Sequence, residues 1–385
     1  MPPERPPRIL VLVQSQQAYG RDIIEGIIRW ARHTRRWELL FDTRIDPAAH
    51  TRHTDRQIDG IIAESRSPER RKWLEGLRVA KVVISGEHPV PGSVWVQADN
   101  RRVGTMAFDH LYELGLRRFA YCGYEDAEFS TERLAGFKQA MQKHRLEAQK
   151  LEVHLSPRQP GDFEPESPEL IPWVQGLAKP VGVFAVTLDR ARNLALACRE
   201  GGVLVPEQVA IIGVNNDPLV AEMADPPVTG IDHGTVEIGY RGAEALDQLL
   251  RGEPTPSSIK IEPVEIQARQ STDILAINHP DVAQAVRLIR ERALDGLTVK
   301  DILKQIPVSR RMLEQAFRQT LGRTIHQEIT RVRMQHVEQL LRETSLDLPQ
   351  IAVRSGYRYG SQLSAAFRKH MGMSPRAYRA EHATS

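Results

Sequence analysis

The sequence predicts a two-lobed α/β body, built on mostly parallel sheets, followed by an all-α domain with two helix-turn-helix motifs. Short apolar runs alternate with amphipathic helical segments over residues 8–268, which is typical of βαβ units. From about residue 279 the pattern contains helices only, and the unit of helix, short turn and helix occurs twice. A chain of 385 residues is long enough for two or three domains, so each part can have a core of its own.

Composition narrows the class of protein further. Charged residues make up 26% and hydrophobic residues 41%, which is typical of a globular protein, and no apolar run approaches the ~20 residues that a membrane span needs. Near the N-terminus the apolar run is residues 9–13, which is too short for the h-region of a signal peptide. We therefore expect a cytoplasmic protein with no membrane partner.

The body is expected to contain about ten strands with helices between them. Ten strands are too many for one compact nucleotide-binding half, so two similar lobes joined by crossovers fit better. The strand-like runs are residues 9–13, 39–41, 58–63, 82–85, 94–97, 118–122, 151–155, 181–186, 209–214 and 259–265. The helical segments are residues 19–32, 68–77, 102–114, 131–143, 168–177, 190–200 and 238–250.

Polar side chains follow several of these strands at their carboxyl ends, where open α/β folds bind ligands. Amide, carboxylate, guanidinium and phenol groups suit a neutral polyhydroxylated ligand, because each hydroxyl both donates and accepts a hydrogen bond. The alternative is that such residues only form turns and helix caps. The residues concerned are Ser15, Gln16, Gln17, Tyr19, Arg21, Asp99, Asn100, Thr187, Asp189, Asn215, Asn216 and Asp217.

Catalytic and metal-binding alternatives find little support. The sequence has no P-loop, no dinucleotide-binding G-x-G-x-x-G after the first strand, no H-E-x-x-H and no G-x-S-x-G, so we expect no catalytic residues, no cofactor and no enzyme. His50 and His53 lie near Asp55, but this polar, arginine-rich segment offers no further ligand, and an exposed loop without metal is expected. Cys122 and Cys198 fall in an apolar strand and on a helix face, where buried unreactive thiols are expected.

Charge is distributed unevenly along the chain. Residues 279–385 contain 18 Lys and Arg against 10 Asp and Glu, a net charge of +8, whereas the preceding 278 residues carry a net charge of −5. A basic tail on a mildly acidic body is typical of nucleic-acid binding. The alternative is a solvated basic face without a partner.

The tail repeats one arrangement of helices. Ser309 can cap the N-terminus of a helix and Gly322 can end it, and the turn before Ser309 contains Pro307. A repeated helix-turn-helix joined by a long helix is far more specific than a single copy. The expected helices are residues 281–292, 298–305, 309–321, 325–342, 348–354 and 359–370.

The second helix of each pair carries polar groups on one face. In the first pair, Met312, Leu313, Ala316 and Phe317 are expected to pack, which leaves the opposite face for a DNA groove. Arginine can bind guanine and glutamine can bind adenine through paired hydrogen bonds, and basic residues beside them can bind phosphate. The expected DNA-binding residues are Ser309, Arg310, Arg311, Glu314, Gln315, Arg318, Arg358, Tyr359, Gly360, Ser361, Gln362, Ser364, Arg368 and Lys369.

Several motifs of the body occur in an order that is specific to one family. They are Gln97-Ala-Asp-Asn100 with Gly104, residues 114–121, Glu132-Arg-Leu-Ala-Gly-Phe137, residues 205–216 and residues 227–231. On these motifs the body resembles the effector-binding domain of the LacI/GalR regulators, which has the fold of type I periplasmic sugar-binding proteins.

The resemblance implies particular residues for the sugar. Arg133 matches the sugar-binding arginine of the family, Asn215 matches its polar contact at a strand end, and Phe163 would supply a stacking ring. Two positions depart from the pattern: Leu188 stands where a polar contact is frequent, and His233 where glutamine is common. The expected effector-binding residues are Gln17, Tyr19, Arg21, Asp99, Arg133, Phe163, Asp189, Asn215 and His233.

The tail resembles the AraC/XylS DNA-binding domain over its whole length. The matching segments are residues 308–318 with Leu321 and Gly322, residues 331–334, Leu340 and Leu341, residues 351–357, residues 367–375, and Tyr378 with Arg379. Ala365 stands where the family often has arginine, so the first reading helix is expected to contribute more base specificity than the second.

A LacI-like body on an AraC-type tail is the arrangement of the XylR-like transcriptional regulators. Gln17-Ala-Tyr-Gly-Arg21 and Glu25-Gly26 fit that family too. The resemblance implies a transcription factor of sugar catabolism, an activator whose effector is xylose or another pentose. Its partners would be a double-stranded DNA operator, a second copy in a homodimer and RNA polymerase. The rival functions are an α/β enzyme acting on a sugar and a sugar-binding module.

The same resemblance sets the expected domain boundaries. The effector domain covers residues 8–270, with one lobe formed by residues 8–98 plus 233–255 and the other by residues 99–232 plus 256–270. A linker covers residues 271–280, and the DNA-binding domain covers residues 281–385, with helix-turn-helix motifs at about 298–321 and 347–371.

Overall fold

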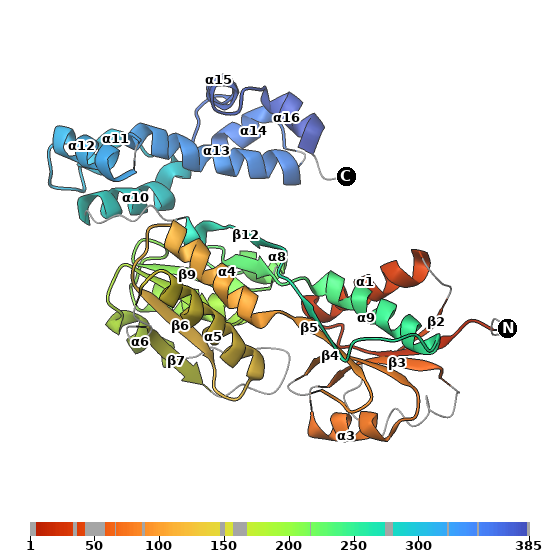
Figure 1. Ribbon diagram of the computed structural model, residues 1–385. Coiled ribbons are helices and arrows are strands. Elements are labelled where there is room, and N and C mark those ends of the chain that lie inside the picture. The colour runs from red at the N-terminus through yellow and green to blue at the C-terminus, as the bar shows by residue number, and fades with distance from the viewer. Residues whose placement is uncertain are drawn as a thin grey trace. The chain divides into compact units, whose positions relative to one another are not determined.

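A computed structural model describes residues 5–33, 37–42, 58–65, 67–86, 89–146, 151–156, 168–215, 217–273, 280–321, 323–344 and 346–382 (Figure 1). The chain divides into two compact units, Met1–Ile274 and Leu275–Ser385. In the described part of the chain no helix has the length and the apolar composition that crossing a bilayer requires.

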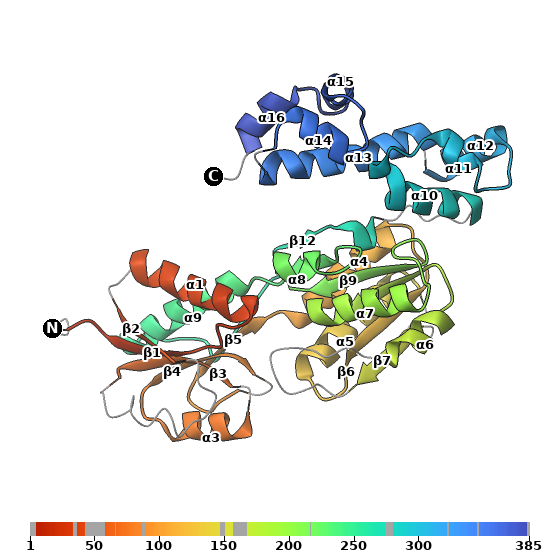
Figure 2. The same cartoon turned by 180° about the vertical axis from the view of Figure 1, so that it is seen from behind.

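The first lobe of the body is a six-stranded parallel sheet with helices on both faces. Alternate residues of its first strand point to opposite faces, so that Ile9 and Val11 join one core and Leu10 and Leu12 the other. Helices α1 (Ala18–His33) and α9 (Thr235–Leu250) cover one face and α3 (Pro68–Gly76) lies on the other, as both views show (Figures 1 and 2). In order across the sheet, the strands are β11 (Ser258–Ile261), β5 (Val94–Ala98), β4 (Ala80–Gly86), β3 (Gly60–Ser65), β1 (Arg8–Leu12) and β2 (Glu38–Phe41).

The second lobe repeats this plan, except that one edge strand is antiparallel. Helices α4 (Asn100–Glu113) and α5 (Glu128–Lys143) cover one face, and α6 (Leu170–Gly176) and α7 (Leu188–Glu200) the other (Figures 1 and 2). The antiparallel strand is β12, which pairs with β10. Across the sheet the order is β12 (Glu265–Gln267), β10 (Thr229–Asp232), β9 (Val209–Val214), β8 (Val181–Ala185), β6 (Phe119–Tyr124) and β7 (Glu152–Ser156).

Residues 259–265 are not one strand, as the sequence predicted, but parts of two. β11 pairs with β5 in the first sheet, and β12 pairs with β10 in the second. The expected assignment of residues 256–270 to the second lobe is therefore wrong for β11, because a parallel partner in the first lobe provides its hydrogen bonds. β10 and the short helix α8 (Pro218–Glu222) were also absent from the predicted alternation, since both are only four or five residues long.

Each lobe contains a pair of helices that cross with almost no space between their backbones. A Cβ atom at Gly26 of α1 would lie 2.0 Å from the carbonyl oxygen of Val236 in α9, and a Cβ atom at Gly239 would lie 2.0 Å from that of Ile23. In the second lobe α4 and α5 cross at Gly104 and Gly136. A Cβ atom at Gly104 would lie 2.0 Å from the carbonyl oxygen of Arg133, and one at Gly136 would lie 1.9 Å from that of Arg101. Glycine is therefore required at both crossings, whatever its backbone angles.

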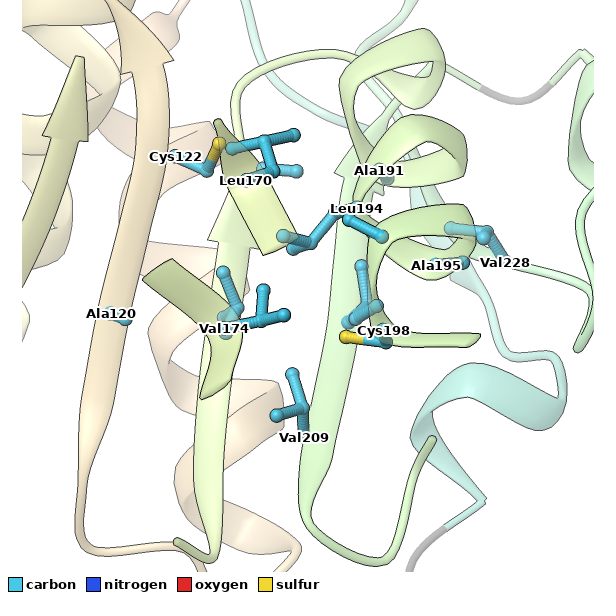
Figure 3. Close-up of a cluster of buried hydrophobic side chains, with 14 of the residues drawn as sticks. Ala120, Cys122, Leu170, Val174, Ala191, Leu194, Ala195, Cys198, Val209 and Val228 are labelled. Carbon is cyan, nitrogen blue, oxygen red and sulfur yellow. The ribbon is translucent and has the colours of Figure 1, made fainter. Parts of the chain in front are cut away.

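A core of α6, α7 and the strands beneath them contains both cysteines (Figure 3). Cys122 of β6 and Cys198 of α7 are buried and carry free thiols. Burial raises the pKa of the Cys198 thiol to about 12, so it stays protonated and unreactive near neutral pH. This confirms the expectation of two buried structural cysteines.

The body ends later than the sequence predicted. Residues 270–272 form a 3₁₀ turn that is anchored in the second lobe: the hydroxyl of Ser271 donates to the carbonyl oxygen of Ile211 (2.6 Å) and accepts from the amide of Thr229 (2.9 Å). Pro280 begins the first helix of the tail. The expected linker of residues 271–280 is therefore too long at both ends, and the segment between the units is reduced to residues 274–279, which lie outside the described residues.

Among the residues of the second unit that the structure describes, the regular elements are helices only, as expected, with one helix more than predicted. Reciprocal capping boxes at Thr298, Thr324 and Asp347 fix the starts of three of them. The final helix, α16, follows Ser374 and was not predicted. The helices are α10 (Pro280–Arg292), α11 (Val299–Leu303), α12 (Arg310–Leu321), α13 (Ile325–Glu343), α14 (Leu348–Arg354), α15 (Gly360–Met371) and α16 (Pro375–His382).

Candidate effector site and nucleic-acid interface

Arg133 lies in α5 near the carboxyl ends of the strands of the second lobe. Its side chain is buried, with Nε donating to Oδ1 of Asn100 (2.9 Å) and Nη1 donating to the carbonyl oxygen of Val186 (2.5 Å). The guanidinium also lies 5.0 Å from the ring centroid of Phe129. Burial lowers the pKa of Arg133 to about 10, so the group is still charged at neutral pH. These contacts orient a buried cation and use two of its five N–H donors.

His233 lies next to this arginine, on the crossing from β10 to α9. It is 4% exposed, and its ring stacks on that of Tyr19, at the start of α1, with centroids 5.5 Å apart and planes 6° from parallel. Nδ1 has no hydrogen-bond partner within the part of the chain that is described. Burial, and secondarily the charge of Arg133, lowers the pKa of His233 to about 3. The neutral imidazole can therefore both donate to and accept from a hydroxyl-bearing ligand.

Two carboxyl groups of the body, one on each lobe, have raised pKa values. Burial raises the pKa of Asp22 in α1 to about 6, and Asp232 and Glu25 add to the effect. Burial also raises the pKa of Asp189 in α7, with Asp217 adding to the effect while the charge of Arg192 opposes it. Asp217, at the N-terminus of α8, raises the pKa of both groups, so Asp22 and Asp189 are connected through this one aspartate although they lie on different lobes.

Arg21 and Asp217 connect the lobes at this place. Nη2 of Arg21, in α1, lies 3.8 Å from Oδ2 of Asp217, which caps α8 by accepting from the amide of Leu219 (3.0 Å). Nη1 of Arg21 also donates to the carbonyl oxygen of Gln16 (2.7 Å). Arg21 therefore has contacts within the protein, and its predicted contact with the effector stays a prediction.

The remaining predicted effector residues have the following positions. Gln17 is half-buried, and its carbonyl oxygen accepts from the amide of Arg21 (3.2 Å). Asp99 caps α4 by accepting from the amide of Arg102 (3.0 Å), which is the cap that the sequence left open as an alternative. Asn215 has a positive φ of 105° and donates its amide to the carbonyl oxygen of Ile231 (2.9 Å). Phe163, together with Asn216, His50, His53 and Asp55, lies outside the described residues.

Two further residues interact with predicted effector residues: Asn100, which the sequence named among the polar strand-end residues but not in the expected effector-binding set, and Asp22, which it did not name. Asn100 is buried, and its side chain holds Arg133 while Nδ2 donates to Oε2 of Glu132 (3.3 Å). Asp22 lies three positions after Tyr19 on α1. Its neighbour Arg21 was among the predicted effector residues, but Asp22 was not. Residues three apart on a helix lie on the same side, so the spacing from Tyr19 to Asp22 was the signal that could have identified Asp22.

In the second unit, the first helix-turn-helix consists of α11 and α12. Ser309 caps α12 by accepting from the amide of Met312 (3.3 Å), as expected. Leu313 and Phe317 are buried, whereas Met312 is 64% exposed. The prediction that Met312 packs is wrong, because a residue just before Leu313 is turned by a helical step away from the core. Exposed along the outer face are Arg310, Arg311, Gln315 and Arg318, and Glu314 is half-buried.

The second helix-turn-helix, α14 and α15, matches the first at an offset of fifty residues. Leu363 and Phe367 are buried at the positions that correspond to Leu313 and Phe317, so both reading helices present the same face. Tyr359 is 55% exposed, and the guanidinium of Arg358 lies 5.4 Å from its ring centroid. On the outer face of α15, Ser361, Gln362, Arg368 and Lys369 are exposed, and Gly360 and Ser364 are half-buried.

Family models match both units of the chain. A periplasmic binding protein-like domain matches residues 108–272, and a helix-turn-helix domain matches residues 302–381. The first match covers mainly the second lobe, and the second covers both reading helices.

Several relatives match the chain over nearly its whole length. The chain is 29% identical to the xylose operon regulatory protein of Haemophilus influenzae, over 97% of this chain and 98% of that protein, and 29% identical to that of Escherichia coli strain K12, over 97% and 96%. A solved structure of a xylose-binding transcription activator, XylR, is 26% identical and superimposes with a TM-score of 0.84, covering 99% of this chain and 100% of that one. A LacI-family regulator of Enterococcus faecium with bound ribose, 22% identical, has a TM-score of 0.57 over 69% of this chain and 98% of its own, which shows a common fold of the body.

Proposed function

We propose that this chain, a XylR-like transcription regulator in which a periplasmic binding protein-like domain precedes a helix-turn-helix domain, binds xylose between the two lobes of its body and changes its affinity for operator DNA in response. The observation that carries the proposal is the similarity to xylose operon regulators over 97% of the chain. The family models and these relatives make the chain a regulator and not an enzyme.

The chemistry around Arg133 supports a small sugar as the effector. Arg133 supplies charged donors, neutral His233 supplies one donor and one acceptor, and Asp189 supplies acceptor oxygens. Each sugar hydroxyl can both donate and accept a hydrogen bond, so a sugar can pair with all three side chains. The ring of Tyr19 stacks on the imidazole and fixes the orientation of its plane. A ligand without hydroxyls would leave the buried Nδ1 of His233 without a partner, which is costly.

The second part of the proposal concerns the DNA. The exposed faces of α12 and α15 would lie in major grooves, with Arg311 and Gln315 contacting bases and with Arg368 and Lys369 contacting phosphates. As a regulator that binds an operator, the protein would work in the cytoplasm as a homodimer and activate transcription through RNA polymerase. Residues 8–273 would form the effector domain and residues 280–385 the DNA-binding domain.

Regulation requires that the two parts be coupled. Xylose would favour an arrangement in which the two lobes are closed around it. Coupling arises only if xylose has a higher affinity for one arrangement than for the other. The short segment of residues 274–279 would pass the change to the DNA-binding domain.

A thermal-shift comparison tests the effector. Xylose, ribose, arabinose, lyxose and glucose are each added to the full-length protein, and a specific ligand at 100 times its Kd should stabilise the folded state by about 2.7 kcal/mol. We expect xylose to raise the Tm and glucose, the larger control, to leave it unchanged. An equal response to every sugar, or to none, would contradict the proposed effector.

A selection from random-sequence duplexes tests the DNA-binding part. The full-length protein is expected to enrich one family of duplexes, and xylose should change the affinity for the enriched duplex. Affinity that depends on salt but not on sequence would contradict an operator-binding role.

A further inference from the structure

The two helix-turn-helix motifs have separate hydrophobic cores that share one long helix, α13. Its first half packs with α10, α11 and α12, and its second half packs with α14, α15 and α16. The boundary between the two cores falls between Val332, which belongs to the first, and Met334, which belongs to the second. α13 is one continuous helix without proline or glycine that runs through both cores, so it links the two motifs directly, and side-chain contacts at the boundary add to what fixes the angle between them.

Arg333 lies at this boundary and contacts both halves. Its Nε donates to the carbonyl oxygen of Ala293 (2.8 Å) and its Nη2 donates to that of Leu297 (3.0 Å), both just after α10 in the first half. Its guanidinium lies 5.2 Å from the ring centroid of Tyr357, in the turn between α14 and α15 of the second half. One planar group therefore joins the first half, the shared helix and the turn of the second motif.

The same turn lies directly against the first half at Gly356. This residue has a φ of 72°, and a Cβ atom there would lie 2.5 Å from the carbonyl oxygen of Ala293 and 2.9 Å from that of Leu294. The backbone of the second motif thus touches the very carbonyl group that accepts from Arg333. Ser355, just before it, is completely buried, so this contact excludes water.

We propose that Arg333 is a positioning residue that fixes the distance and the rotation between the two reading helices, α12 and α15, and so sets the number of base pairs that separate the DNA segments they contact. The inference rests on the proposed DNA-binding function. Its carrying observation is that Arg333 joins elements of both halves at the boundary between the two cores along α13. Lysine cannot replace it, because an ammonium group lacks the planar fork that donates twice and stacks on a ring.

The expected effect on DNA follows from helix geometry. One inserted base pair moves the second segment by about 3.4 Å and rotates it by about 34° around the duplex axis. A rigid pair of reading helices cannot follow this change, so native protein should discriminate strongly against it. A pair without Arg333 keeps only α13 and the contact at Gly356 between its halves, and should tolerate the insertion better, at a modest cost in affinity for the original duplex.

The experiment uses full-length protein and a duplex enriched by the native chain from a random library. Footprinting locates the two contacted segments, and one base pair is then inserted between them. Affinities for the original and the lengthened duplex are measured for the native chain, Arg333→Ala and Arg333→Lys. We expect a loss on insertion of about 10-fold or more for the native chain and of about 3-fold or less for both variants.

Arg331→Ala is the matched control. Arg331 lies on the same helix and donates to the buried carboxylate of Glu328 (2.8 Å), three residues before it in the first half of α13. Its loss should lower the Tm but leave the native discrimination between the two duplexes. The inference is overturned if Arg333→Ala and Arg333→Lys discriminate like the native chain, or if Arg331→Ala relaxes discrimination equally. A native chain that enriches no duplex overturns the proposed function itself, and this inference with it.

Discussion

The ring of His233 lies flat against the ring of Tyr19, 5.5 Å away between centroids and 6° from parallel. Tyr19 belongs to the first helix of the chain, whereas His233 lies more than two hundred residues later on a crossing between the lobes. The stack buries the imidazole beside the cation of Arg133, and both effects favour the neutral ring. A neutral buried histidine makes the stability of the body depend on pH in a predictable direction.

The first prediction concerns that dependence. The folded pKa of His233 is about 3 against an ordinary value of 6.5, so between these values the unfolded chain binds one more proton than the folded chain. The contribution of His233 to stability is complete above pH 6.5 and is lost as the pH falls. His233→Gln should remove up to about 1.4 kcal/mol per pH unit from the slope of the unfolding free energy below pH 6.5, measured by urea unfolding.

Asp22 provides the control of opposite sign. Its folded pKa is raised from 3.8 to about 6, so its contribution to stability is present at acid pH and is lost as the pH rises through about 6. Asp22→Asn should therefore make the rise of stability with pH steeper, where His233→Gln makes it shallower. Equal slopes in native protein and both variants would show that neither group is buried as described.

The second prediction concerns Arg133. Arg133→Ala should weaken xylose binding by about 2–5 kcal/mol, measured by calorimetric titration, because a buried charged contact to the ligand is lost. Arg102→Ala is the matched control: Arg102 lies on α4, is about half exposed and pairs with Glu262 at 3.5 Å, so its loss should change xylose affinity by less than about 0.5 kcal/mol. Unchanged affinity in Arg133→Ala would remove this residue from the effector site.

The third prediction concerns the helix crossing next to Arg133. Gly104→Ala would place a methyl group 2.0 Å from the carbonyl oxygen of Arg133 and 2.8 Å from the amide nitrogen of Phe137. Because backbone atoms cannot move aside cheaply, we expect a loss of about 1–3 kcal/mol in the free energy of unfolding, or more, together with weaker xylose binding as α5 shifts.

Gly76→Ala is the control for this substitution, since no atom lies within 4 Å of the new methyl group at the end of α3. It should leave stability unchanged or raise it by up to about 1 kcal/mol, because alanine is the better helix former. If both substitutions had the same effect, the close crossing of α4 and α5 would not be what determines the result.

The fourth prediction separates base contacts from phosphate contacts. Arg311→Ala or Gln315→Ala should change the preferred base at one operator position, at a cost of about 1–3 kcal/mol. Arg368→Ala should weaken binding to all sequences alike and reduce the salt dependence. The measurement is affinity across an operator library at two salt concentrations, and identical profiles for Arg311→Ala and Arg368→Ala would refute the division of roles.

The fifth prediction concerns the segment between the two units. Inserting a long Gly/Ser stretch between Asp273 and Pro280 should leave xylose binding and DNA binding intact but remove the effect of one on the other, because orientation would no longer be transmitted. The measurement is operator affinity with and without saturating xylose, in native and lengthened protein. A full xylose effect in the lengthened protein would contradict coupling through this segment.

The periodic spacing of apolar residues was sufficient to predict most of the helices and strands, because it indicates which face of each element is buried. Leu313 and Phe317 were found in this way and are indeed buried. Met312 was not, because a residue at the edge of an apolar face can lie on either side of the boundary. β11 was assigned to the wrong lobe because a strand's partner depends on residues far away, here β5.

The candidate effector site was less accessible from the sequence. Arg133 and His233 were predicted only through the family resemblance, since a lone arginine in a helix has no periodic signal. Asn100 and Asp22 acquire their significance from contacts between segments that are distant in the chain. Asp99 was predicted to bind the effector, and the structure shows it capping α4. An aspartate that follows a strand can cap a helix or contact a ligand, and the sequence alone does not distinguish the two roles.

The anchoring of Ser271 to β9 and β10 has a mechanical consequence. Ser271 and Thr272 fasten the end of the body to the second lobe, where Thr272 also lies 3.1 Å from Nε2 of His110 in α4. The described part of the body therefore ends on the second lobe, at the residues from which the chain continues toward the second unit. Any rotation of the second lobe against the first would carry this exit point with it.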